Sequence, residues 1–349
     1  MSALRVLVVE DSLTVRRYLC DVLNADPELS VVGEAADGET AIALCESLSP
    51  SVVTMDMMLN GVSGLAATQH IMTHKPTPIL VVSSSENRGE VMSTYDALAA
   101  GAVDALEKPA AESAAEAWEN QFREAVKLVA RIRAIRRPRI SNRVTDSARR
   151  SPVRATPELI AIGASTGGPT ALVSVLGTLP KGFPIPVLVV MHLSEAFAEG
   201  FTGWLGANIK IDARFARDGE PLARIAGTAI LAPPNRHLIL RSGSLHFDDG
   251  PERHSCKPSV DVLFDSVARS SPNSVGCLLT GMGRDGATGL SAMKTAGALT
   301  IVQDEASCAV FGMPREAIRL GAATQVLPLA EIGPAIAALD VGRRGERHP

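Results

Sequence analysis

Short apolar runs alternate with amphipathic stretches along the N-terminal part of the chain. The apolar runs predict buried strands, and the stretches between them carry apolar residues at helical spacing. Five strands are expected, at residues 5–9, 31–35, 52–55, 79–82 and 103–106. Because regular alternation of strands and helices is typical of a parallel sheet with helices on both faces, this segment is predicted to be a (βα)5, doubly wound α/β domain.

The same pattern resumes in the C-terminal part of the chain, with more strands. Apolar runs predict strands at residues 159–162, 187–191, 228–231, 275–279, 299–302 and 325–327. Residues 238–247 have the pattern of a β-hairpin, which is expected as a short addition to this domain. The C-terminal part is therefore expected to be a second and larger α/β domain, doubly wound around a mostly parallel sheet.

The stretch between the two domains loses its apolar periodicity. Residues 112–135 predict one helix, with Trp118 and Phe122 as core contacts on its apolar side. Residues 136–154 then hold seven arginines and two prolines, a composition typical of a solvated, flexible tether. We predict domains at residues 1–136 and 156–349, joined by an Arg-rich linker at residues 137–155, with RNA binding by the linker as the alternative.

Bulk properties narrow the range of functions. With 349 residues, 46% of them hydrophobic, the chain can bury two ordinary cores, and its net charge of -4 gives no reason to expect a nucleic-acid or membrane-surface partner. The N-terminus lacks the features of a signal peptide and no apolar run reaches transmembrane length, so a cytoplasmic location is expected. The five scattered cysteines are predicted to be buried free thiols that form neither disulfides nor a zinc site.

Polar residues follow the predicted strands of the first domain where those strands end. Glu10 and Asp11 follow the first strand and Asp56 the third, while Ser83 and Lys108 follow the fourth and fifth. The carboxyl ends of parallel strands meet at the ligand-binding edge of an open sheet. Three carboxylates gathered there repel one another unless a cation compensates them, and Mg²⁺ suits such oxygen ligands. Taken singly, the residues also have structural explanations, such as a helix cap or a surface charge.

This arrangement resembles the receiver domain of two-component response regulators, over the whole N-terminal segment. The resemblance implies that Asp56 accepts a phosphoryl group from the phosphohistidine of a histidine kinase, and that Ser83 and Lys108 contact that group. It also implies a Mg²⁺ site whose ligands are Glu10, Asp11, Asp56 and the backbone of Met58.

Three local details follow from the same resemblance. The Lys108–Pro109 peptide bond is expected to be cis, as in the family pattern. Ala105 stands where the family usually has an aromatic switch residue, and Leu59-Asn60 stands where Met-Pro is usual after the acceptor. Phosphorylation is expected to survive both departures, whereas coupling by a ring flip cannot operate at Ala105.

A glycine-rich turn in the second domain carries a candidate nucleophile. Ser165 lies in Gly163-Ala164-Ser165-Thr166-Gly167-Gly168, between a predicted strand and a predicted helix, with the spacing of a nucleophile elbow. The N–H groups at the following helix start, that of Thr166 among them, could hold a developing oxyanion. A phosphate-binding loop or a plain tight corner is the competing interpretation.

A base and an orienting acid are available at two other strand ends. His192 directly follows the strand at 187–191, and Asp285 follows the strand at 275–279. Together with Ser165 they form the constellation that acyl transfer requires, in a chain order that disfavours the usual α/β-hydrolase fold. Alone, His192 could be a structural hydrogen-bonding group and Asp285 a helix cap. Three further histidines compete as the base, namely His237, His246 and His254.

The C-terminal domain resembles the chemotaxis protein-glutamate methylesterases. The motifs that carry the resemblance are Gly163–Gly168, Met191-His192, Ala232-Pro233, Arg236–Leu238, Pro258–Phe264, Leu279–Ala287 and Phe311–Ala317. The resemblance implies a triad of Ser165, His192 and Asp285, with the backbone N–H of Met282 helping to bind the oxyanion. Arg284 stands where the family often has Asn, a change expected to affect only the substrate rim.

The sequence thus predicts a phosphorylation-regulated enzyme of chemotactic adaptation. It is expected to hydrolyse glutamate γ-methyl esters on methyl-accepting chemoreceptors, releasing methanol, and by resemblance to deamidate receptor glutamines. Mg²⁺ is expected for receiver phosphorylation and no cofactor for hydrolysis, and neither nucleic acid nor membrane insertion is expected. The alternative is a response regulator whose C-terminal domain binds a partner without hydrolysis; a DNA-binding output ranks third, because no helix-turn-helix signature or basic stripe is present.

Overall fold

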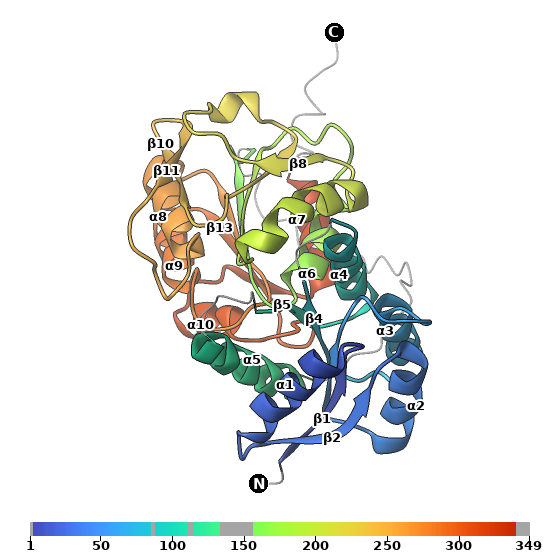
Figure 1. Ribbon diagram of the computed structural model, residues 1–349. Helices are drawn as coiled ribbons and strands as arrows, with labels where there is room; N and C mark the ends of the chain where they lie inside the picture. The colour runs from blue at the N-terminus through green and yellow to red at the C-terminus, as the bar shows by residue number, and fades with distance from the viewer. Residues whose placement is uncertain (1–2, 85–87, 110–114, 133–155, 340–349) are drawn as a thin grey trace. The chain divides into compact units, whose positions relative to one another are not determined.

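The computed structural model describes residues 3–84, 88–109, 115–132 and 156–339 (Figure 1). Its contacts divide into two compact units, one N-terminal and one C-terminal. The predicted linker at residues 137–155 lies outside the described residues. No helix within the described ranges is long and apolar enough to cross a membrane.

The N-terminal unit is a five-stranded parallel sheet in the order β2-β1-β3-β4-β5. Its strands are β1 (Leu4–Val9), β2 (Leu29–Ala35), β3 (Val52–Met55), β4 (Ile79–Ser83) and β5 (Asp104–Glu107). Its helices are α1 (Leu13–Asn24), α2 (Gly38–Leu48), α3 (Gly64–His74), α4 (Arg88–Ala100) and α5 (Ala115–Ala130). Helices α1 and α5 cover one face of the sheet and α2, α3 and α4 the other (Figure 1).

Local sequence explains where these elements begin and what they bury. The side chains of Ser12, Asp37 and Ser63 cap α1, α2 and α3 by accepting hydrogen bonds from first-turn N–H groups. All four residues of β3 are buried, as expected for a central strand covered on both faces. Trp118 and Phe122 of α5 join the core formed with β1 and α1, which confirms their expected role as core contacts.

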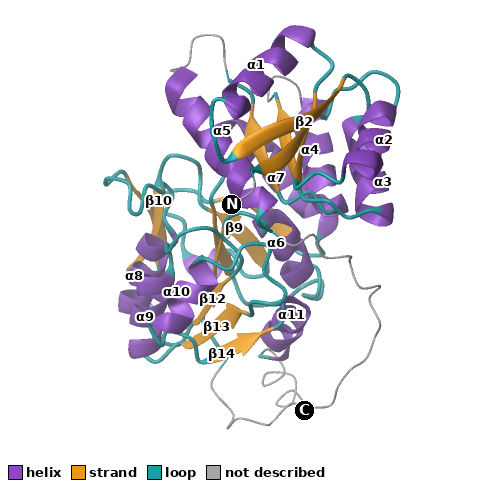
Figure 2. Cartoon of the chain, turned by 90° about the horizontal axis from the view of Figure 1, so that it is seen from below, coloured by secondary structure: helices purple, strands orange, loops and turns teal. Residues whose placement is uncertain are grey.

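The C-terminal unit is built on seven parallel strands in the order β14-β13-β12-β6-β7-β9-β8. Figure 2 shows β12, β13 and β14 side by side in this sheet. The seven strands are β6 (Ile160–Ala164), β7 (Val187–Met191), β8 (Asp212–Phe215), β9 (Thr228–Leu231), β12 (Val275–Leu278), β13 (Leu299–Gln303) and β14 (Gln325–Leu327). The helices are α6 (Gly168–Leu176), α7 (Glu195–Asn208), α8 (Val260–Ser270), α9 (Ala287–Thr295), α10 (Met313–Arg319) and α11 (Leu329–Ala338), with a 3-10 turn η1 (Leu222–Arg224). The predicted hairpin is present as β10 (His237–Arg241) and β11 (Ser244–Asp248), which pair with each other in antiparallel fashion.

The order of the strands reverses at β6. Strand β6 pairs with β7 on one side and with β12 on the other. The strands that follow β6 in the sequence are therefore added to both sides of it. Such a topological switch point is where open α/β sheets bind ligands, beyond the carboxyl ends of the strands. The residues that follow β6, β7 and β12 therefore meet at one edge.

The predicted fold class is confirmed in both units, and every predicted strand is present. Strand β8 was not predicted, because Asp212–Phe215 has no buried residue and too little apolar character to stand out. Of the helix predicted at residues 112–135, the described part is helical over Ala115–Ala130.

The expectation of a cis peptide bond at Lys108–Pro109 is wrong. Among the described residues, the cis bond is Lys257–Pro258. The backbone N–H of Lys108 donates to the Ser83 carbonyl at 2.9 Å, which holds Lys108 at the sheet edge. The Lys108–Pro109 peptide bond is trans. The two isomers differ by only about 0.5–1 kcal/mol before proline, so local packing decides between them.

Candidate functional site

Ser165 lies on the turn between β6 and α6, at the switch point of the larger sheet. Its backbone N–H donates to the Thr280 carbonyl at 3.0 Å, and its carbonyl accepts from the Gly168 N–H at 2.6 Å. Gly167, which caps α6, has a φ of 76°, and a Cβ there would lie 2.5 Å from the Cβ of Ala309. The turn therefore requires glycine two residues after the serine, and it leaves Ser165 half-buried at the strand edge.

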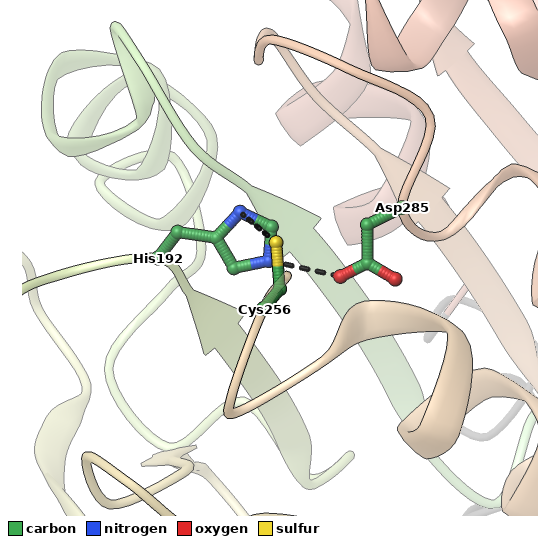
Figure 3. A group of neighbouring side chains, drawn as sticks. All are labelled: His192, Cys256 and Asp285. Carbon is green, nitrogen blue, oxygen red and sulfur yellow. Dashed lines mark hydrogen bonds and ion pairs between the residues drawn. The ribbon is translucent and has the colours of Figure 1, made fainter. Parts of the chain in front are cut away.

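His192 and Asp285 meet beside this turn. The His192 N–H donates to the Ala164 carbonyl at 3.2 Å, and its Nε2 lies 2.9 Å from Oδ2 of Asp285 (Figure 3). Since an ionised carboxylate only accepts hydrogen bonds, Nε2 carries the proton and Nδ1 is the basic nitrogen of the neutral ring. The predicted pairing of His192 with Asp285 is thus present, although the two residues are far apart in the sequence.

The carboxylate of Asp285 is held by the start of helix α8. Its oxygens accept from Ser259 Oγ at 2.7 Å, from the N–H groups of Val260 and Asp261 at 2.7 and 3.0 Å, and from the Gly286 N–H at 3.0 Å. Burial acts to raise the pKa of Asp285, but the hydrogen bonds from His192 and Ser259 outweigh burial and lower it. Asp285 therefore stays ionised, and it does not cap the helix that follows it, because Gly286 occupies the N-cap position of α9.

The imidazole of His192 is more basic than an ordinary histidine. Burial alone would lower the pKa of His192, but its interactions with Asp285 and Cys256 outweigh burial and raise the pKa to about 9. Cys256 Sγ lies 3.8 Å from Nδ1, the ring nitrogen that does not contact Asp285 (Figure 3). Sequence reasoning missed both Cys256 and Ser259, since neither follows a strand of the sheet.

Ser165 is not hydrogen-bonded to the imidazole. Within the described residues no hydrogen bond joins Ser165 Oγ to His192, so the structure pairs two of the three predicted triad members and places the third at the neighbouring strand end. Catalytic contacts of this kind are often formed only when substrate binds. The backbone N–H groups of Thr166 and Met282 donate no hydrogen bond to other described residues, which leaves both open to an incoming oxygen.

The competing histidines are engaged elsewhere. His237 is buried and accepts from the Ser259 N–H at 3.1 Å, while its Nε2 contacts the Pro251 carbonyl. His254 pairs with Asp261, and His246 lies 3.7 Å from a carboxylate oxygen of Asp218. Of the four candidates, His192 is the one that contacts Asp285.

The second site lies at the edge of the N-terminal sheet. Asp56 is only 2% exposed, and Lys108 Nζ lies 3.0 Å from its Oδ2 and 2.8 Å from Oε2 of Glu10. Burial, together with repulsion from Glu10, raises the pKa of Asp56 to about 6 against the attraction of Lys108. Burial also opposes the charge of Lys108, but the carboxylates of Asp56 and Glu10 outweigh it and raise the pKa of Lys108.

These residues fit a Mg²⁺ ion. Carboxylate oxygens of Glu10, Asp11 and Asp56 lie within 4.8 Å of one another. Buried Oδ1 of Asp56 accepts no hydrogen bond from the described residues, so it has a free position for a cation. Asn60, at the position where the family usually has proline, donates to Oδ2 of Asp11 at 3.2 Å.

Ser83 and Met58 lie at the same edge. The Ser83 hydroxyl donates to Oε1 of the buried Glu90 at 2.8 Å, so it must turn away from Glu90 to contact a phosphoryl group. Met58 follows β3 closely and is 55% exposed, and its backbone N–H acts to lower the pKa of Asp56 against the larger effect of burial. The predicted roles of these two residues stay predictions.

Comparison with known proteins identifies both units. The family described as CheB methylesterase matches residues 160–336, and the family described as response regulator receiver domain matches residues 6–117. The chain belongs to the CheB methylesterase family. Both resemblances found in the sequence are thereby confirmed.

Similar proteins of this family match along nearly the whole chain. A protein of Anaeromyxobacter dehalogenans (strain 2CP-C), named protein-glutamate methylesterase/protein-glutamine glutaminase 2, is 43% identical over 96% of this chain and 97% of its own. A protein-glutamate methylesterase/protein-glutamine glutaminase of Nitrosospira multiformis is 42% identical over 98% of each chain. The crystal structure of the Thermotoga maritima CheB methylesterase catalytic domain is 33% identical, with a TM-score of 0.50, and matches over 53% of this chain and 100% of that chain.

Proposed function

We propose that the chain is a phosphorylation-regulated protein-glutamate methylesterase of chemotactic adaptation. Its substrates are glutamate γ-methyl esters on the cytoplasmic helices of methyl-accepting chemoreceptors, and it also deamidates receptor glutamines. The observation that carries this proposal is the 2.9 Å contact between His192 and Asp285, at strand ends on either side of the strand that leads to Ser165. The printed names of the similar full-length proteins support the choice of substrate.

We assign a role to each side chain of the hydrolytic site. In the neutral form of His192, Nδ1 takes the Ser165 proton as Oγ attacks the ester carbonyl, and the N–H groups of Met282 and Thr166 stabilise the oxyanion. The proton then passes from His192 to the departing methoxide, which leaves as methanol. Water, deprotonated by the same nitrogen, releases the glutamyl group from Ser165, and Asp285 stabilises the imidazolium in both steps.

The receiver site transfers a phosphoryl group to Asp56 from the phosphohistidine of a histidine kinase. Glu10, Asp11, Asp56 and the backbone of Met58 would hold Mg²⁺, which neutralises charge on the phosphoryl oxygens. Lys108 adds a second positive charge within 3.0 Å of Asp56, and Ser83 turns its hydroxyl to the bound phosphoryl group. Phosphorylation of Asp56 raises the rate of hydrolysis, for which a change of about 1.4 kcal/mol already gives a tenfold effect.

Methanol release from methylated receptor tests the hydrolytic proposal. Ser165→Ala is expected to lower the rate by at least a thousandfold while the variant stays folded, because the nucleophile is lost. Ser174→Ala, in helix α6 just after the turn, is the matched control and should keep the wild-type rate. Release by Ser165→Ala at the wild-type rate would favour the alternative of a regulator that binds a partner without hydrolysis.

A further inference from the structure

Cys256 forms a cluster with His192 and Asp285 (Figure 3). The three side chains offer a sulfur, an imidazole nitrogen and a carboxylate oxygen that lie within 4.8 Å of one another. Thiolate, imidazole and carboxylate are the ligand types that proteins use for zinc. This site was not predictable from the sequence, since no spacing motif links the three residues.

We propose that the His192–Cys256–Asp285 cluster binds a divalent cation of the zinc class, and that its occupancy stops ester hydrolysis. The statement about hydrolysis rests on the proposed function, whereas the statement about binding does not. The cation is an inhibitor here and takes no part in the reaction.

The distances in the cluster are close to those of a zinc site. Bond lengths of about 2.0–2.3 Å place the ligand atoms of a tetrahedral site roughly 3.3–3.6 Å apart. Nε2 of His192 and Oδ2 of Asp285 are 2.9 Å apart, and Cys256 Sγ is 3.8 Å from the other ring nitrogen, Nδ1. One ligand atom of each of the three residues lies within 4.8 Å of the other two. A cation that replaces the proton between Nε2 and Asp285 therefore binds all three residues if the sulfur moves inward by roughly 1 Å.

Two of the three ligands are fixed by their surroundings before any cation binds. Asp285 is held by Ser259 and the start of α8, as described above. Cys256 ends a tight turn in which its N–H and carbonyl both bond to Arg253, at 3.0 and 3.2 Å. The two residues inside that turn, His254 and Ser255, have φ values of 55° and 58°, which are unfavourable for side chains other than glycine or Asn. The turn that holds the Cys256 thiol near His192 therefore contains two residues in an unfavourable backbone conformation.

Access and charge also favour a cation. Cys256 is half-buried, whereas the other four cysteines are buried, so the prediction of buried free thiols holds for four of the five. Solvent reaches the cluster from the sulfur side, where water can fill the fourth coordination position. A thiolate and a carboxylate together balance a doubly charged cation; the thiol proton is released to solvent and the proton of the neutral ring moves from Nε2 to Nδ1, without any oxidation.

Binding would remove the base of the proposed reaction. A cation bound to Nε2 of His192 occupies the lone pair of that nitrogen and leaves the ring proton on Nδ1. The ring can then neither accept the Ser165 proton nor return it to the leaving group. Inhibition should therefore be complete at full occupancy and reversed by a chelator.

Cobalt absorption tests binding without reference to activity. The full chain is titrated with Co²⁺ in excess Mg²⁺, and a thiolate-to-cobalt charge-transfer band is expected in the wild type and in Cys308→Ser. The band should be absent in Cys256→Ser and should disappear when Zn²⁺ is added. The receiver carboxylates offer only oxygen ligands and cannot produce the band. A wild-type protein without the band, or a band of equal strength in Cys256→Ser, would overturn the proposal.

Methanol release with and without Zn²⁺ tests the inhibition. Each variant is compared with itself, and equimolar Zn²⁺ should lower the wild-type and Cys308→Ser rates at least tenfold but that of Cys256→Ser less than twofold. Equal inhibition of Cys256→Ser and the wild type would refute the assignment of the inhibitory site. If no variant releases methanol, the proposed function fails, and the cobalt band still decides whether the cluster binds a cation.

Discussion

The carboxylate of Asp285 accepts hydrogen bonds from five donors, and only one of them belongs to the imidazole that it orients. The other four come from Ser259, from the start of α8 and from Gly286. Backbone donors cannot be removed by substitution, so Ser259 is the position at which this support can be tested.

Ser259→Ala is expected to lower kcat by about tenfold or more with little change in KM. The loss of a hydrogen bond to a charged group costs about 1–3 kcal/mol, and here it frees the group that positions His192. Ser266→Ala is the matched control, because Ser266 is a buried, doubly hydrogen-bonded serine of the same helix that does not contact Asp285. Both variants should lose stability, but only Ser259→Ala should lose kcat, and Ser259→Thr should recover part of it. Equal losses of kcat in Ser259→Ala and Ser266→Ala would show that Ser259 has only a structural role.

The raised pKa of His192 predicts a pH-dependent contribution to stability. A histidine whose folded pKa of about 9 exceeds its ordinary value of 6.5 stabilises the fold fully below pH 6.5 and loses that contribution as the pH rises through 9. Urea denaturation should show His192→Gln less stable than the wild type at pH 6, by on the order of 2–4 kcal/mol, with the gap closing by pH 10. A gap that stays constant from pH 6 to pH 10 would contradict the shifted pKa.

At the scale of elements, the turn from β6 to α6 fixes the position of Ser165. Gly167 combines a left-handed φ with a close approach to Ala309, and the two causes can be separated. Gly182 has nearly the same φ, 77° against 76°, but nothing within 4 Å of a Cβ built there.

Gly167→Ala is therefore expected to destabilise the C-terminal unit more than Gly182→Ala. The control carries only the cost of the φ angle, about 1 kcal/mol, whereas Gly167→Ala adds the displacement of Ala309 and of the loop that carries it. Thermal unfolding measures the difference, and hydrolysis should fall only in Gly167→Ala. Equal decreases in Tm for Gly167→Ala and Gly182→Ala would show that the loop at Ala309 moves aside without an energetic cost.

The elements themselves were largely predictable, and the physical reason is burial. Central strands such as β3 and β7 are buried along their whole length and appear in the sequence as unbroken apolar runs. Strand β8 lies at the edge of its sheet, buries none of its residues fully, and left no such signal. Strand ends also located Ser165, His192 and Asp285, since parallel strands bring their carboxyl ends to one edge.

Side-chain partners were less predictable than strand ends. Cys256 and Ser259 reach the site from the segment that leads into α8, and their approach depends on how that helix packs, which periodicity does not encode. The engagement of Ser83 with Glu90, and of Asn60 with Asp11, depends in the same way on side-chain conformations. Sequence patterns identified the sheet edges but not the hydrogen bonds made there.

At the scale of the whole molecule, regulation requires both units. With acetyl phosphate and Mg²⁺, the full chain should release methanol faster, by about tenfold, while Asp56→Asn should not respond. A fragment of residues 156–349 should hydrolyse receptor esters at a rate that acetyl phosphate leaves unchanged. An equal response of Asp56→Asn would exclude Asp56 as the acceptor, and a response of the fragment would exclude the N-terminal unit as the receiver of the signal.

The reversal of strand order at β6 has a consequence for how activity is acquired during folding. Ser165 and His192 follow strands that are adjacent in both sequence and space, but Asp285 joins them only when the chain returns to pair β12 with the other side of β6. Long-range pairings of this kind carry a large loop-closure cost and form slowly. A refolding chain should therefore recover much of its helix content before its first turnover, and the return of catalysis should report the closing of the sheet around its central strand.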